Sequence, residues 1–324
     1  MKILEAIITG ITQGSMIALV ALGYTMVYGV LKLINFAHSE VFMMAAYFGL
    51  IFVAFLVGDA SSVNGILSHG TTASGSFGLL HAHPLLATAL ATMLAMVAAA
   101  MLGVGVERMA YRPLRGRGKG ALVRVTPLVT ALGMSVLLQN LAQLLFSARF
   151  RPYPQVLTGS IHLPVLGTLA TSRAVILVAA VVVMTGLELI VKRTWFGKAM
   201  RALSANEEAA RLMGIRTSRV ISMTFALGSS LAALGAVLFC LDQSQVYPTM
   251  GVIIGTRAFV AAVLGGIGSI SGAVLGGLAI GVIGELVKLT SYSGGVDVLV
   301  FLVLIVVLLV RPAGLLGSAR PEKV

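Results

Sequence analysis

The segment LKLINFAHSEVF, residues 31–42, places four polar side chains within six positions between two long apolar runs: Asn35, His38, Ser39 and Glu40. Such groups can hydrogen-bond to one another, to solvent or to a polar solute. They do not suit a metal ion, because only the adjacent Glu40 accompanies His38 at ligand spacing. The free-energy cost of such a polar cluster depends on whether it is surrounded by water or by lipid.

A second polar group interrupts the apolar run VLLQNLAQLLF, residues 136–146, with Gln139, Asn140 and Gln143. Gln139 and Gln143 share one helical face because they are four positions apart. Amide groups that face lipid would go without hydrogen-bond partners, so we expect this face to point into a helix bundle. Hydrogen bonding between helices and the lining of a path for a solute both explain the cluster.

The composition indicates that the protein lies in a membrane. The chain has 324 residues, of which 58% are hydrophobic and only 10% charged, and 37 are glycine. Soluble domains carry about 25% charged residues, so this chain cannot cover a soluble surface. It is expected to be an all-α polytopic membrane protein. A single cysteine, Cys240, excludes an intramolecular disulfide and a cysteine-cluster metal site, and no cofactor is implied.

The basic residues predict a topology, because Lys and Arg collect on the cytoplasmic side of a membrane. Residues 107–124 hold six of them and residues 192–219 hold seven. Placing these two loops inside, with Lys32 and the C-terminal tail, puts 17 of the 23 basic residues there and the N-terminus outside. The net charge of +12 then indicates contact with anionic lipid headgroups, with no need for nucleic acid.

Apolar runs long enough to span a membrane occur near residues 9–31, 41–57, 85–106, 127–146, 174–191, 220–241 and 296–310. The alternation holds only if residues 257–288 cross twice, as pieces near 257–270 and 272–288, which predicts about eight or nine segments. Glycines four apart in this stretch favour close helix packing, and a re-entrant hairpin that lines a path is the alternative. The candidate hinge and packing glycines are Gly265, Gly266, Gly268, Gly272 and Gly276.

The loop of residues 197–216 is rich in Ala, Arg, Leu and Glu and predicts a short amphipathic helix. Such a helix could rest on lipid headgroups. Its stretch EAARLMG, residues 208–214, also has the form EAA-x-x-x-G, which resembles the loop of ABC importer permeases that docks into an ATPase subunit. Further stretches fall in the order of one family: GYTMVYGVLKLINFAHSEVFMMAAY, YRPLRG, TALGMSVLLQN, AFVAAVLGGIGSISGAVLGG and RPAGLLG.

Over nearly its whole length the chain resembles the LivH-type permeases of branched-chain amino acid ABC transporters. The resemblance implies a single transmembrane domain over residues 1–324, with broken helices like those of the ribose permease, in the bacterial inner membrane. It also implies a homologous LivM-type permease subunit, two cytoplasmic ATPases, and a periplasmic binding protein that delivers leucine, isoleucine, valine and other amino acids. The chain itself has no ATPase motif and is not expected to be an enzyme.

The family's residues carry over position by position. Glu208, Ala209, Ala210 and Gly214 match the coupling-loop signature, and Arg201 lies on the same loop. Asn35, Phe36, Ala37, His38 and Glu40 match the stretch INFAHGE. Ser39 stands where the family usually has glycine, which argues against a left-handed backbone turn there. The outer loop of residues 58–84 is longer than usual and could meet the binding protein or be a tolerated insertion.

Two readings of the polar segment 31–42 therefore remain: a turn among lipid headgroups, or a helix break that faces the central path and forms a gate. For the cargo, urea or short-chain amides are the alternative to amino acids. An ion-driven secondary transporter would need intramembrane carboxylates in a relay. The spans offer little beyond Glu188 and Glu285, and Lys288 can pair with the latter. HExxH and GxSxG motifs of membrane enzymes are absent from the sequence.

Overall fold

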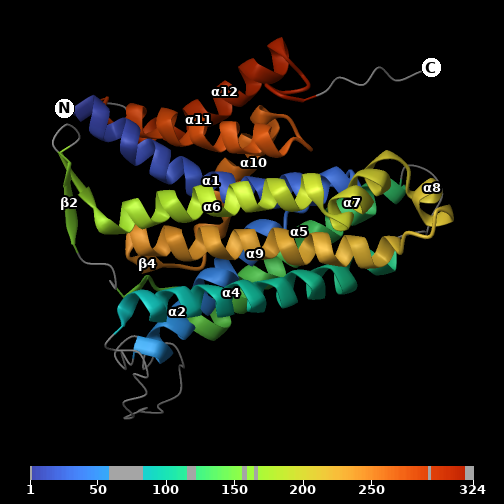
Figure 1. The fold of residues 1–324 in the computed structure, drawn as a ribbon, viewed down its shortest axis with the longest axis horizontal. Coiled ribbons are helices and arrows are strands. Elements are labelled where there is room, and N and C mark those ends of the chain that lie inside the picture. The colour runs from blue at the N-terminus through green and yellow to red at the C-terminus, as the bar shows by residue number, and fades with distance from the viewer. Residues whose placement is uncertain are drawn as a thin grey trace.

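A computed structural model describes residues 2–57, 83–114, 122–154, 159–163, 167–290 and 293–317. They form a bundle of long helices that lie alongside one another (Figure 1). Most of the expected outer loop, residues 58–82, and the centre of the loop 107–124 lie outside the described part of the chain. The expected helical membrane fold is confirmed.

Seven described helices or helical runs are long and apolar enough to cross a membrane. They are α1 (Lys2–Leu31), α2 (His38–Val57), α4 (Pro84–Val106) with its extension, α5 (Leu122–Phe146), α6 (Thr171–Arg193), α9 (Thr217–Gln243) and α11 (Ile270–Lys288). Two shorter apolar helices, α10 (Met250–Gly265) and α12 (Val296–Val310), bring the described apolar segments to nine. This agrees with the expected number of about eight or nine.

The two ends of the bundle differ. One end carries α7 (Trp195–Ala205) and α8 (Glu207–Leu212), and the opposite end carries the start of α1 and strand β2 (Figure 1). β2 (Ser160–Leu163) pairs antiparallel with β3 (Gly167–Ala170), and β1 (Arg151–Pro152) pairs with β4 (Gln245–Val246). We call these the α8 end and the hairpin end. The strands are the one departure from the expected all-α class.

The expected break in the glycine-rich stretch lies at residues 266–269, between α10 and α11. A methyl group added to Gly265, Gly272 or Gly276 would overlap backbone atoms across this pair of helices. On the other side of α11, a Cβ on Gly277 would lie 2.6 Å from the Cα of Ala18 in α1. Glycine therefore lets α11 approach both neighbours closely. α10 begins at Met250, seven residues before the expected start.

Gly268 departs from its expected part in helix packing. It lies in the turn rather than on a helix, with φ +95°, and its neighbour Gly266 has φ +103°. This is the left-handed region that residues with a Cβ rarely adopt. Gly268 and Gly272 are therefore not a helix-packing pair. Gly266 and Gly268 shape the turn instead.

The C-terminal stretch RPAGLLG closes the end of α10. The amide groups of Leu315 and Leu316 donate hydrogen bonds of 2.8 and 2.9 Å to the carbonyl oxygens of Leu264 and Gly265. The last carbonyls of a helix have no partner within it, so these bonds satisfy groups that would otherwise be unpaired. The motif that contributed to the family resemblance thus has a structural task at the α10–α11 turn.

Two helices stand where the sequence analysis expected one in residues 197–216. The backbone of Asn206 is extended, with φ −159°, and separates α7 from α8. Its side-chain oxygen accepts a 3.0 Å hydrogen bond from the amide of Ala209. Asparagine is a preferred N-terminal cap, so it ends one helix and starts the next. The composition of this loop predicted its helical structure correctly, but it did not predict that Asn206 divides the helix in two.

The polar interval after α4 is also more helical than expected. α4 continues into a π-helical turn, η1 (Glu107–Tyr111), and a 3-10 turn, η2 (Arg112–Leu114), while η3 (Ser293–Gly295) precedes α12.

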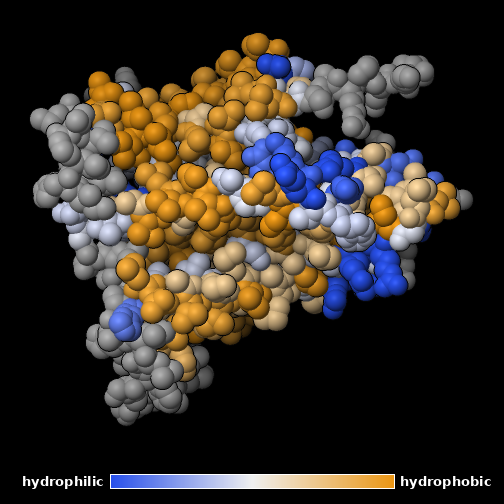
Figure 2. All heavy atoms as spheres, in the orientation of Figure 1, coloured by the Kyte–Doolittle hydropathy of each residue, from blue (hydrophilic) through white to orange (hydrophobic). Residues whose placement is uncertain are grey.

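Figure 2 shows hydrophobic side chains over the side of the bundle in view and hydrophilic atoms gathered at the α8 end. This distribution agrees with a chain whose flanks face lipid.

We predict that Gly281→Ala destabilises the bundle, because its methyl group would overlap the backbone of Gly10 and Gly14 in α1. Overpacking typically costs about 1–3 kcal/mol. The measurement is the thermal midpoint in detergent. Gly133→Ala is the matched control, since nothing lies within 4 Å of the added atom and alanine favours a helix. Equal midpoints for the two variants would contradict the packing described for α1 and α11.

Candidate functional site

The connection between α1 and α2 turns back into the protein. α2 begins at His38, whose imidazole lies against Gly23 of α1. Gly23 lies eight residues before the end of α1, or about 12 Å along its axis. Residues 32–37 therefore turn back beside α1 as non-helical backbone between two apolar helices. Such backbone is tolerated only where protein or a water-filled cavity surrounds it.

Asn35 and His38 are both buried in this break. The Asn35 side chain accepts a 2.8 Å hydrogen bond from the hydroxyl of Tyr111 in η1. The His38 ring packs edge-on to Tyr24, with 4.8 Å between ring centroids. Its Nε2 atom has no hydrogen-bond partner among the described residues. The break is therefore fixed from α1 and from η1, and one of its polar atoms remains available.

Glu40 is the most unusual group of the break. Its side chain is fully buried, and neither carboxylate oxygen has a hydrogen-bond partner among the described residues. It lies against α10 at Gly251, where a Cβ would be 2.8 Å from Oε2. Leaving a buried carboxylate without a partner is costly, so such a group marks a site that receives a ligand or proton or undergoes a change of conformation.

Ser39 and Glu40 border a cavity of about 170 Å³. Its wall comes from α1, from the break and the start of α2, from α5 and from α10: Tyr24, Phe36, Ser39, Glu40, Leu132, Ser135, Val252, Gly255, Thr256 and Phe259. Ser39 is helical and donates a 2.8 Å hydrogen bond to the carbonyl of Phe36, so it adopts no left-handed turn. An apolar wall with a few polar groups is typical of a site for a small solute.

The second polar cluster is split across α5. Gln139 and Gln143 are half-buried, whereas Asn140 is exposed on this chain and its side-chain amide donates a 2.8 Å hydrogen bond to the Val136 carbonyl. None of the three is among the residues that line the cavity beside Glu40. The structure therefore does not bring them together with the break.

At the α8 end, α8 presents its side chains to the surface. Glu208 and Ala209 are exposed and Ala210 is buried, while Leu212 and Met213 are 88% and 82% exposed. Apolar side chains this exposed at a helix end suit insertion into a partner's groove. The surface formed by residues 207–213 is called the α8 surface below.

Gly214 ends α8 in a Schellman motif. Its φ is +82°, its amide bonds to the Arg211 carbonyl, and the amide of Ile215 bonds to the Ala210 carbonyl, both at 3.0 Å. This is the geometry in which a left-handed residue satisfies the last carbonyls of a helix. The final glycine of EAA-x-x-x-G therefore fixes where α8 stops and how the chain leaves it.

α7 connects the α8 surface to the rest of the bundle. The Arg201 guanidinium donates a hydrogen bond to the Val191 carbonyl at the end of α6. A cavity of about 90 Å³ separates α7 from α1 and from the α10–α11 turn, and it is lined by Met200, Arg201, Ser204, Thr25, Gly29 and Gly268, among others. Beside this cavity α7 also contacts α1, so movement of α7 would reach α1 directly and the glycine turn across the cavity.

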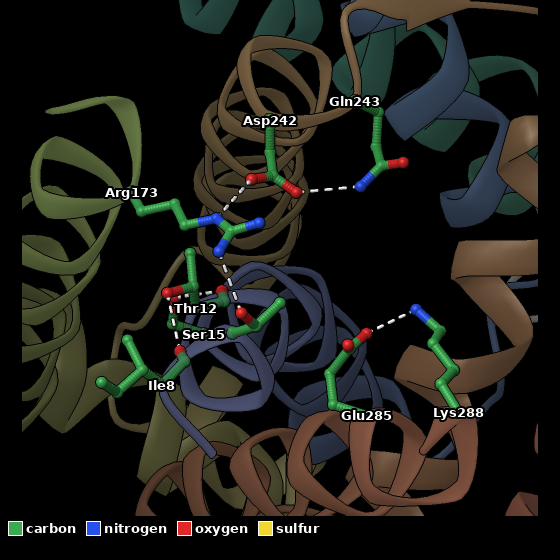
Figure 3. A network of polar contacts seen from close by, with 9 residues as sticks. Ile8, Thr12, Ser15, Arg173, Asp242, Gln243, Glu285 and Lys288 are labelled. Carbon is green, nitrogen blue, oxygen red and sulfur yellow. Dashed lines mark hydrogen bonds and ion pairs between the residues drawn. The ribbon is translucent and has the colours of Figure 1, made fainter. Parts of the chain in front are cut away.

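A polar network at the hairpin end was not expected from the sequence. Figure 3 shows Arg173 of α6 pointing to Asp242 of α9, with Gln243 on the other side of that carboxylate. The guanidinium lies 3.5 Å from Asp242 and donates a 2.9 Å hydrogen bond to Thr9 of α1. Nearby, Lys288 pairs with Glu285, as their spacing allowed. Single charges at the ends of distant runs gave no sequence signal for this network.

The long apolar helices define a multi-pass membrane protein. Residues 6–309 match the family described as the branched-chain amino acid transport system / permease component, and the chain belongs to that family. The family is described as a component of a transport system.

Several curated proteins are similar over the full length. The chain is 38% identical to the high-affinity branched-chain amino acid transport system permease protein BraD of Pseudomonas aeruginosa, covering 99% of this chain and 98% of that one. It is 36% identical to LivH of Escherichia coli, covering 99% and 97%. The ribose import permease protein RbsC of Bacillus subtilis is 32% identical over 38% of this chain and 40% of its own length. No solved structure matches the chain.

We predict that Tyr111→Phe destabilises the break, because it removes the only hydrogen bond found for the buried Asn35 side chain in the described structure. Leaving a buried polar group unsatisfied costs about 1–3 kcal/mol. Tyr28→Phe is the control, since no side-chain hydrogen bond of Tyr28 is found there. Thermal midpoints and transport rates of both variants provide the test. A Tyr111→Phe protein as stable and active as the control would show that this bond does not hold the break.

Proposed function

We propose that this chain is a membrane-spanning subunit of an ATP-driven importer for branched-chain amino acids. The observation that carries the proposal is the similarity to BraD and LivH over 99% of the chain, since both are named for that transport. The polar break agrees with it, because a transported amino acid needs fixed dipoles along its way across a low-dielectric layer.

The cavity beside Glu40 supports a path at the break. Glu40 and Ser39 are among its lining residues, together with Tyr24, Phe36 and Phe259, and both carboxylate oxygens of Glu40 are buried beneath the wall. An ammonium group suits the carboxylate and the aromatic faces, while an apolar side chain suits the rest of the wall. Asn35 and His38 lie behind this wall as gate residues. Gln139, Asn140 and Gln143 belong to the path only where α5 meets a second permease subunit.

The α8 surface is proposed as the contact with an ATPase subunit. Glu208, Ala209, Ala210 and Gly214 form or end the helix that docks, and Arg201 holds α7 to the end of α6. Closure of two ATPases would push α7 and α8, and the push would pass to α1 and to the α10–α11 turn. Gly265, Gly266, Gly268, Gly272 and Gly276 let these elements hinge and slide.

The assembly is proposed to follow from the family. A homologous LivM-type permease subunit would complete the pore, two ATPases would bind at the α8 end, and a periplasmic binding protein would deliver cargo at the hairpin end. The α8 end is then cytoplasmic and the membrane is the bacterial inner membrane. The hydrophilic atoms gathered at the α8 end in Figure 2 and the seven basic residues of 192–219 support this orientation.

The test is uptake of radiolabelled leucine into proteoliposomes that hold this chain with its partner subunits, with binding protein outside and ATP inside. Wild type is compared with the double variant Glu208→Lys, Gly214→Trp. Glu5→Lys, an exposed change in the first turn of α1, is the control. We expect uptake to depend on ATP. The double variant should lose this uptake, whereas the control should retain both uptake and its assembled subunits.

Two results would overturn parts of the proposal. Uptake of urea without leucine would keep the machine and replace the cargo. Uptake that needs no ATP and ignores the α8 variant would contradict an ATP-driven mechanism coupled through this surface.

We further predict that Glu40→Gln lowers leucine uptake roughly tenfold or more, because the ammonium group of the cargo loses a charge-assisted hydrogen bond. Glutamine has the same shape, so the fold should hold. Glu188→Gln removes an exposed carboxylate of α6 that pairs with Lys192 and serves as the control. ATP hydrolysis measured in parallel separates cargo binding from coupling. Unchanged uptake in Glu40→Gln would remove this carboxylate from the path.

A further inference from the structure

Three arginines surround a cavity of about 380 Å³ where α4 and its extension meet α9, at the α8 end. Arg108 comes from η1, Arg112 from η2 and Arg219 from the first turn of α9. The volume lies in the range usual for small-ligand sites. Among the described residues, none of the three guanidinium groups forms an ion pair or hydrogen bond. In the part of the chain that the structure describes, the three positive charges around this cavity therefore have no ion-pair partner.

The local helix geometry explains why these arginines gather. In η1, Glu107 and Tyr111 point inward and are buried, while Arg108 and Arg112 follow each of them by one position and are exposed. The Glu107 carboxylate is not in the cavity wall; it accepts a 2.8 Å hydrogen bond from Ser222 of α9. One negative charge behind three positive ones leaves the wall strongly positive.

The polar part of the wall fits a phosphate group. Ser218 and Ser222 add hydroxyl groups between the arginines. Arginine binds phosphate oxygens through two parallel N–H groups, which makes it the preferred residue for phosphate in a defined geometry. Because Ser222 already donates its hydroxyl proton to Glu107, the donors left for a phosphate are the three guanidinium groups and the hydroxyl of Ser218.

The remaining wall is apolar and belongs to the lipid-facing flank. Val104, Met223 and Ala226 line the cavity on the side toward the middle of the bundle. Met101, one turn before Val104 on α4, is 66% exposed, so the apolar surface continues along the helix. A molecule with a phosphate at one end and hydrocarbon at the other would match both parts of the wall.

The geometry points to a binding site for the phosphate headgroup of an anionic phospholipid, in the leaflet at the α8 end. Basic pockets between membrane helices at this level are known to suit such headgroups. The site lies on the outer side of η1, whose inner side carries the Tyr111–Asn35 hydrogen bond. A bound headgroup would therefore also steady the turn that holds the break. This inference depends on the membrane fold and not on the identity of the cargo.

The experiment is native mass spectrometry of the full-length protein released from nanodiscs that contain phosphatidylglycerol and phosphatidylcholine. The site variant is Arg108→Gln, Arg112→Gln, Arg219→Gln. The control variant is Lys192→Gln, Arg193→Gln, Lys198→Gln, which removes the same charge from the same end of the bundle. We expect the wild type and the control to retain phosphatidylglycerol, and the site variant to lose roughly 100-fold in preference over phosphatidylcholine.

Further arms separate the alternatives. A triple Arg→Lys variant keeps the charge and loses the paired N–H groups, so it should bind phosphatidylglycerol with intermediate strength. Equal losses in the site and control variants would mean that only net charge matters, which overturns a defined site. Inorganic phosphate that protects the site in a lipid-free detergent, with no lipid retained, would assign it to a soluble phosphate instead.

One rival is a contact with an ATPase subunit at this end. Unchanged lipid retention in the site variant, with loss of the ATPase from the purified complex, would establish that contact and overturn the lipid site. If the triple variant fails to fold, as judged by size-exclusion chromatography, Arg219→Gln alone is compared with Arg193→Gln in the same lipids. Identical lipid retention in those two single variants would likewise overturn the proposal.

Discussion

The fold depends on one constraint: every backbone polar group inside the membrane needs a partner within the protein. Continuous helices satisfy this constraint through their own hydrogen bonds. Three interruptions in the described helices do not: those between α1 and α2, after α9, and between α10 and α11. Each interruption has its own solution. Within residues 32–37, Asn35 and Ala37 are buried and the Asn35 side chain accepts a hydrogen bond from Tyr111. The α10 carbonyls receive the amides of Leu315 and Leu316, and strand β4 pairs with β1 after α9 ends. The breaks can exist because distant segments satisfy them.

These contacts join segments that are far apart in the sequence. The C-terminal motif fixes the α10–α11 turn, and that turn borders the cavity beneath α7. Glycines then let α11 lie against both α10 and α1 at backbone distance. Close-packed elements move as bodies rather than by gradual deformation. A push on α8 would consequently be felt at α1 and at the break, which is the behaviour that an importer driven from one side requires.

Much of the fold was predictable from the sequence because a membrane imposes a simple rule on hydrophobic runs. Nearly all spans, the break in the glycine-rich stretch and the polar break near His38 follow from length, apolar character and small residues. The partner of the break did not follow. Asn35 bonds to Tyr111, 76 positions away, and nothing local in either residue indicates that contact.

The errors have local causes. Asn206 divides the predicted single helix because its side chain caps α8, a signal that helix-forming composition hides. The polar cluster of α5 is only partly inward, since helical spacing defines a shared face but not the neighbour that the face meets. The arginine cavity and the network of Arg173 with Asp242 required helices to be placed side by side before their charges could be seen together.

The central claim is that the break borders a path which opens to water during transport. The most direct test is the accessibility of Ser39→Cys to a hydrophilic thiol reagent, in a Cys240→Ala background and in the assembled transporter. Ala45→Cys, fully buried one to two turns later in α2, is the reference. We predict that Ser39→Cys reacts at a rate that changes with ATP and cargo, while Ala45→Cys stays unreactive. A Ser39→Cys as inert as the reference in every state would contradict the account and make the break a packed structural element.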